Sequence, residues 1–169
     1  MHLLLRICDK LLTNLIDDAK SADDKNEVLG LKSNNLNELV EKIRDCGVSF
    51  CTWTLKGSKE ELDWTSLSGS DYKNLLEKLP WKIFFSIHHN THSKTDKLWE
   101  DFLSLYRFIT HDEETKTIEF VFSKYKEWVN SFLDLGSMCQ GYQNSTPYLH
   151  CLVYHMPYFV VNIIFMNIN

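Results

Sequence analysis

The chain has 169 residues, of which 44% are hydrophobic and 13% aromatic, so it can bury one sizeable hydrophobic core. Its 18 Lys and Arg residues against 23 Asp and Glu residues give a net charge of −5, which disfavours direct DNA binding through phosphate contacts. Six glycines, three prolines and no long polar tract argue against a disordered, collagen-like or repeat protein. Five cysteines, an odd count, and early charges at Arg6, Asp9 and Lys10 predict a reduced intracellular chain without a signal peptide.

The first 47 residues show the pattern of two helices. Apolar residues recur at helical spacing over residues 2–19, which predicts an amphipathic helix there. Because that helix has no N-terminal cap, we expect further sequence to have preceded it. The polar stretch 21–35 predicts a loop, and a second helix from Leu36 should stop at Gly47.

The period changes to two between residues 48 and 67, where two alternating runs flank the sequence KGSKEE. This alternation predicts a short two-stranded ribbon. Ser70 and Asp71 can cap a following helix, which Pro80 should end. Residues 81–87 are apolar enough to belong to the core.

Three more helices follow. The first should run from Asp96, and the second should start near His111 to Glu114, where acidic residues suit a helix N-terminus. The third should start at Pro147, behind the capping side chains of residues 144–146, and should kink or restart at Pro157.

Together these elements predict a mainly α fold in two parts. We expect residues 1–144 to form a helical domain with one short β-ribbon at 48–67, and residues 145–169 to form an apolar C-terminal helix kinked at Pro157.

From Pro147 to Met166 twenty successive residues carry no Asp, Glu, Lys or Arg, which is long enough for a membrane span. His150, His155, Pro157 and Asn162 weaken that interpretation. We therefore favour a contact surface, through which the chain associates with itself or with a protein partner. Membrane contact stays an alternative. The apolar side chains that need cover include Leu149, Leu152, Val153 and Phe159.

Common enzyme motifs, including Gly-rich phosphate loops, Gly-x-Ser-x-Gly and His-Glu-x-x-His, do not occur in the sequence. His88, His89 and His92 form a cluster that is better interpreted as a solvated loop than as a metal site, because no carboxylate or thiol is spaced with them. Cys46 and Cys51 are too far apart for a zinc knuckle, so we expect two buried thiols.

His150 and His155 are the strongest candidates for metal ligands. Five positions on an ideal helix correspond to about 140° around its axis, so the two rings should not face one ligand. Cys151 and His155, four positions apart, would share a face and form half of a zinc site. The alternative is that these histidines are hydrogen-bonded residues of the core or of an interface.

Four segments, in order, resemble Transib-type transposases and the catalytic subunit of the V(D)J recombinase. They are MHLLLRICDKLLTNLI at the N-terminus, LDWTSLSG from Leu62, LWEDFLSLY from Leu98 and TPYLHCLVYHMP from Thr146. The resemblance covers roughly residues 2–160. It implies a helical insertion within an RNase H-like catalytic core whose three acidic residues bind two divalent ions.

The resemblance also implies that these catalytic acids lie outside this chain and that residues 160–169 diverge from the family. It implies a nuclear location and a family zinc site to which His150 and His155 contribute, together with a Cys-x-x-Cys pair that this sequence lacks. Without that pair we expect no cofactor and at most weak zinc binding.

The sequence thus favours a catalytically inactive, truncated transposase fragment, namely the helical insertion domain of a cut-and-paste DNA transposase. A helical protein–protein interaction module is the first alternative, and a small protein with a C-terminal membrane span is the second.

Overall fold

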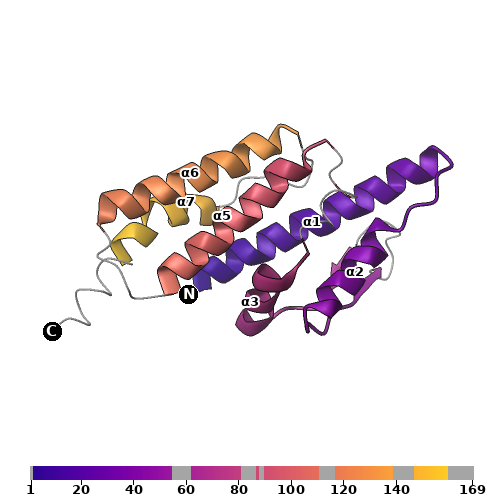
Figure 1. Ribbon diagram of the computed structural model, residues 1–169, viewed down its shortest axis with the longest axis horizontal. Helices are drawn as coiled ribbons and strands as arrows, with labels where there is room; N and C mark the ends of the chain where they lie inside the picture. The colour runs from indigo at the N-terminus through magenta and orange to yellow at the C-terminus, as the bar shows by residue number, and fades with distance from the viewer. Residues whose placement is uncertain are drawn as a thin grey trace.

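The structure is a computed structural model that describes residues 2–54, 62–80, 87, 90–110, 117–138 and 147–159. Within these residues it is mainly helical, with one two-stranded antiparallel sheet. The predicted mainly α class with a short ribbon is therefore confirmed. In Figure 1, α5, α6 and α7 lie on one side of the long helix α1, whereas α2 and α3 lie on the other.

Helix α1 (His2–Val28) is longer than the sequence pattern indicated. The loop predicted at residues 21–35 is wrong up to Val28, because this polar stretch continues the helix. No glycine or proline interrupts it before Gly30, whose φ of +70° ends the helical path. A helix tolerates polar residues where it is exposed to solvent, so their presence here does not end α1. At the end of α1 and in the turn that follows, Val28, Leu29 and Leu31 are 88%, 71% and 58% exposed.

Helix α2 (Asn35–Asp45) packs against α1 and ends where Gly47 adopts a φ of +83°, as predicted. Its start depends on α1. The carboxylate of Asp23 accepts hydrogen bonds from the backbone N–H groups of Asn35 and Leu36 and from the Ser33 hydroxyl. Asp23, which is distant in sequence, thus caps N–H groups in the first turn of α2 that have no acceptor within the helix.

Strands β1 (Thr52–Thr54) and β2 (Leu62–Trp64) form the ribbon, with Thr52 opposite Trp64. Helix α3 (Gly69–Lys78) follows. Its N-cap is Ser68 rather than the predicted Ser70, and Asp71 completes a capping box by accepting from the Ser68 backbone N–H at 2.9 Å.

Helices α5 (His92–Thr110) and α6 (Ile118–Gly136) form an antiparallel pair. The indole N–H of Trp128 donates a hydrogen bond to the Leu98 carbonyl at 2.9 Å and fixes their register. Helix α5 begins before Asp96. The predicted start of the next helix, near His111 to Glu114, lies outside the described residues. The described helix α6 follows its N-cap Thr117, whose hydroxyl accepts a hydrogen bond from the Phe120 backbone N–H.

Helix α7 (Pro147–Tyr154) packs against both α1 and α6. Leu149, Leu152 and Val153 are 4%, 0% and 5% exposed, so the protein's own core covers three of the apolar side chains for which we expected outside cover. Residue His155 lies in a turn, and residues 156–159 are helical again. Among the described residues, no helix combines the length and the apolar character needed to cross a membrane. Residues 160–169 lie outside the described residues.

Candidate functional site

Of the predicted metal ligands, His150 lies within α7 and His155 directly follows its end, and their ring centroids are 5.6 Å apart. Both side chains are exposed. The two rings are thus closer together than an angle of about 140° around an ideal helix indicates. Helix α7 ends at Tyr154, and the turn at His155 brings its ring towards His150, with an angle of 62° between the ring planes.

Pro157 gives a physical reason for this turn. A proline ring clashes with the carbonyl four residues earlier, here that of Val153, and proline has no N–H to donate. The backbone bonds around the turn are uneven: the His155 N–H donates to the Cys151 carbonyl at 3.0 Å, whereas the Phe159 N–H reaches the His155 carbonyl only at 3.4 Å. The interruption falls two residues before the proline and sets the position of the His155 ring.

The described donor set around these rings does not fit the closed zinc site that the resemblance implies. Such a site needs four nitrogen or sulfur ligands. In the part of the chain that the structure describes, no group of three or more His, Cys, Asp or Glu side chains is placed to hold a metal ion. Cys151 is only partly buried and belongs to no such group. The histidines offer two imidazoles, so the described residues supply half of the ligands of a tetrahedral site.

Aromatic rings extend this cluster into a surface. The Tyr154 ring lies 4.6 Å from that of His150 and 5.8 Å from that of Phe122 on α6. The Lys126 ammonium lies 5.9 Å from the centre of the Phe122 ring. We call the exposed side chains of α7 and of the helical residues after it the α7 outer face: Tyr148, His150, Tyr154, His155, Tyr158 and Phe159.

The structure describes part of the other histidine and cysteine groups considered in the sequence analysis. His88 and His89 lie outside the described residues, while His92 is the first residue of α5 rather than part of a loop. Cys46 is buried, and that burial raises the pKa of its thiol. Cys51, expected to be buried, is exposed, with its sulfur 3.2 Å from the Thr65 hydroxyl oxygen.

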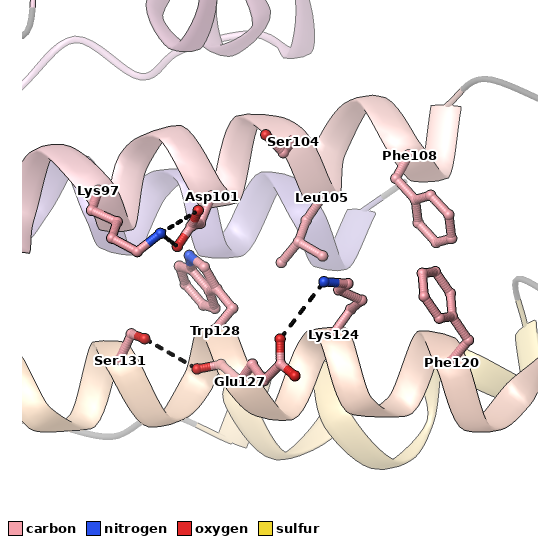
Figure 2. A pocket seen from close by; sticks show the side chains of 10 residues that line it. All are labelled: Lys97, Asp101, Ser104, Leu105, Phe108, Phe120, Lys124, Glu127, Trp128 and Ser131. Atoms are coloured by element: carbon pink, nitrogen blue, oxygen red, sulfur yellow. Dashed lines mark hydrogen bonds and ion pairs between the residues drawn. The ribbon is translucent and has the colours of Figure 1, made fainter.

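A second candidate site, which the sequence analysis missed, is a groove of about 460 Å³ between α5 and α6 (Figure 2). Leu105 and Trp128 lie between the two helices, and the Phe108 and Phe120 rings meet edge to face towards one end, with their centroids 5.8 Å apart. Ten residues line this α5–α6 groove: Lys97, Asp101, Ser104, Leu105, Phe108, Phe120, Lys124, Glu127, Trp128 and Ser131.

Most polar groups of the α5–α6 groove are already paired along their own helices. Lys97 and Asp101 form an ion pair at 3.1 Å, and Lys124 lies 3.8 Å from Glu127. The hydroxyls of Ser104 and Ser131 donate to backbone carbonyls one turn earlier. The groove therefore offers mainly aromatic and aliphatic surface, which suits binding rather than acid–base or nucleophilic chemistry.

The sequence does contain a signal for this groove. Its lining residues occur at the same offsets in both helices, namely 0, 4, 7, 8 and 11 from Lys97 in α5 and from Phe120 in α6. Equal offsets mark one face of each helix. The sequence of either helix alone does not show that these two faces lie side by side.

No family model, curated protein or solved structure matches the chain.

Among the described residues, buried polar atoms without a hydrogen-bond partner include those of the side-chain amide of Asn14, which is 0% exposed, and the hydroxyl of Tyr125. Burial raises the pKa of Tyr125 above its ordinary range, and burial also raises the pKa of the Cys8 thiol to about 12. Both ionisable groups therefore stay protonated at neutral pH, and neither is poised as a base or nucleophile.

Proposed function

We propose that this chain is a catalytically inactive helical domain derived from a cut-and-paste DNA transposase, equivalent to the helical insertion of that enzyme's RNase H-like core. The resemblance puts the catalytic acids of the family outside these residues. Two-metal phosphodiester chemistry requires clustered carboxylates, and in this proposal they belong to another part of the enzyme. The role of this domain is then structural: it holds helices and contact surfaces in place.

One observation supports the proposal most directly: segments that carry the resemblance also build the core. Leu11 in α1, Phe102 in α5 and Leu152 in α7 each belong to such a segment, and each is 0% exposed. Side chains that pack together specify a fold more strongly than exposed ones do. A likeness that falls on helices contributing to one hydrophobic core, in the same order along the chain, is the pattern expected when two proteins share an architecture.

Two experiments test this proposal. The genomic DNA that flanks the coding sequence should contain in-frame remnants of an RNase H-like strand with its acidic residues, together with terminal repeats of a transposon. Flanking DNA that encodes an unrelated domain in the same reading frame would contradict the proposal.

The second experiment incubates the purified full chain with DNA carrying such repeats, in Mg²⁺ or Mn²⁺, and we expect neither nicking nor strand joining. Activity that copurifies with the polypeptide through successive columns, and that changes when its residues are substituted, would rule out an inactive domain.

The α7 outer face favours a second function, that of a helical protein–protein interaction module. Tyr154, Tyr158 and Phe159 are 52%, 58% and 60% exposed on one short segment. Aromatic residues are enriched at protein interfaces, where they combine large contact area with few rotatable bonds. A photoreactive amino acid at Phe159 should yield covalent protein adducts in cells, whereas the same group at the exposed Leu133 of α6 should not. Equal labelling from both positions would argue against a defined interface.

A further inference from the structure

The α7 outer face lacks the composition of a solvent-facing helix surface. A helix on the outside of a protein usually turns charged and polar residues to the solvent, opposite its apolar stripe. The inner side of α7 contributes Leu149, Leu152 and Val153 to the core. Its outer side contributes tyrosine, histidine and phenylalanine instead of charged residues. A helix that is apolar or aromatic all round is normally covered on every side.

We propose that a second copy of this chain covers the α7 outer face, so that the protein forms a two-fold symmetric dimer through α7. This inference rests on the second function proposed above, the interaction module, and names its partner.

The distribution of charge favours a second copy as the occupant. In a two-fold symmetric interface the same patch meets itself, so a charged side chain near the axis faces an identical charge. The chain as a whole carries a net charge of −5, yet no Asp, Glu, Lys or Arg occurs after Asp134. The six side chains of the α7 outer face therefore place no like charges opposite each other when two copies meet, and the neighbouring charge is that of Lys126 on α6, beside the Phe122 ring.

The α5–α6 groove lacks this property. Four of its lining residues are charged: Lys97, Asp101, Lys124 and Glu127. Self-association through the groove would bury these ion pairs and remove their hydration water, which costs free energy. The six side chains of the α7 outer face include no ion pair, so they add no such cost.

The size of the surface indicates a weak dimer. An aromatic side chain buries about 150–250 Å² when it is fully covered, and those of α7 are about half exposed. With the two histidines, we therefore expect roughly 400–600 Å² to be buried per copy, at the lower end for specific interfaces. The dimer should dissociate on dilution, at concentrations in the micromolar range or above.

Sedimentation velocity of the full chain over a concentration series tests the dimer. We expect a reversible shift from monomer to dimer. The substitution Tyr158→Lys should weaken association at least about tenfold, because it places two positive charges in one interface. Leu133→Lys is the matched control, since Leu133 is 46% exposed on α6 and should leave association unchanged.

Mixing two oppositely charged variants tests the symmetry. Tyr158→Lys and Tyr158→Asp should each be monomeric alone and should associate when they are mixed. Circular dichroism checks that both variants fold. If either does not fold, the Tyr154→Lys and Tyr154→Asp pair replaces them, because Tyr154 is also largely exposed.

Three results would overturn the dimer: a chain that stays monomeric at millimolar concentration, an equal effect of Leu133→Lys, or no recovery in the mixture. The photoreactive group at Phe159 separates this failure from failure of the interaction module. Adducts only with other proteins would reject the second copy and keep the module, whereas the absence of any adduct would reject both.

Discussion

The carboxylate of Asp23 accepts a hydrogen bond from the backbone N–H of Leu36 at 2.9 Å, so a residue near the end of α1 serves as a cap for the start of α2. The residue in the N-cap position itself, Asn34, makes no side-chain capping bond. Asp23 also accepts from the backbone and side-chain N–H groups of Asn35, both at 2.8 Å. The junction of the two helices therefore depends on a single carboxylate.

We expect Asp23→Ala to lower the free energy of unfolding by about 1–2 kcal/mol, because it removes a helix cap and leaves several donors without their acceptor. Urea denaturation followed by circular dichroism measures the change. Asp24→Ala is the matched control, since Asp24 is exposed on the same helix, and it should change stability by less than about 0.5 kcal/mol. Equal effects of the two substitutions would show that Asp23 has no special role.

Asp23 also gives stability a dependence on pH. Burial alone would raise the pKa of Asp23, but the hydrogen bonds from Leu36, Ser33 and Asn35 outweigh it and lower this pKa below its ordinary value. The ionised form is therefore favoured in the folded state. Its contribution is complete above the unfolded-state pKa of about 3.9 and is lost as the pH falls through the lower, folded-state pKa. Wild-type stability should thus fall more steeply below pH 4 than that of Asp23→Asn, and parallel curves would contradict this assignment.

Gly47 and Gly69 form a matched pair for testing backbone conformation. Gly47 has a φ of +83°, and an added Cβ would meet nothing within 4 Å, so the cost of Gly47→Ala is conformational and about 1–2 kcal/mol. Gly69 lies in the first turn of α3, with the nearest atom to an added Cβ at 3.6 Å. Gly69→Ala should therefore be neutral or stabilise the protein by up to about 1 kcal/mol. Thermal denaturation of both variants decides, and a stable Gly47→Ala protein would be inconsistent with the left-handed turn.

Trp128 joins α5 to α6 through one buried hydrogen bond and ring contacts. Trp128→Phe removes the N–H that donates to the Leu98 carbonyl and reduces packing against Phe102, whose ring centroid lies 4.9 Å away. We expect a loss of about 1–3 kcal/mol in the free energy of unfolding. Phe120→Leu, at a side chain that is 48% exposed in the same groove, should cost much less. Urea denaturation of both variants tests whether Trp128→Phe lowers the free energy of unfolding more than Phe120→Leu does.

Zinc should not stabilise the full chain as it does a protein with a closed structural site. His150 and His155 supply two ligands, and within the described residues no third His, Cys, Asp or Glu completes a group. We therefore expect equimolar zinc to leave the melting temperature unchanged within error. A rise that disappears in both His150→Ala and His155→Ala would instead show that further ligands come from elsewhere.

Local sequence signals predicted local structure well. The change from helical to alternating period located the ribbon, and Gly47 marked the end of α2, because both features act over a few neighbouring residues. The extension of α1 to Val28 was missed because the polar residues were interpreted as a loop. One of them, Asp23, instead caps α2, which is distant in sequence.

The site was less predictable because it depends on a broken helix. Helical spacing alone placed His150 and His155 on different faces, and the observed 5.6 Å between their rings follows from the turn at His155. Pro157 indicated that the helix would be disturbed but not at which residue. The α5–α6 groove required the register of two helices, which the buried bond from Trp128 to Leu98 sets.

Contact between α1 and α7 has a consequence for the time at which the protein can fold. The ribosome makes α1 first and α7 last of the described helices, so the side of α1 that α7 covers stays without its partner through nearly the whole of synthesis. Contacts between segments so distant in sequence form slowly, and exposed apolar surface favours aggregation meanwhile. We therefore expect nascent chains that lack residues 147–159 to bind chaperones, and native packing to be completed only after those residues have left the exit tunnel.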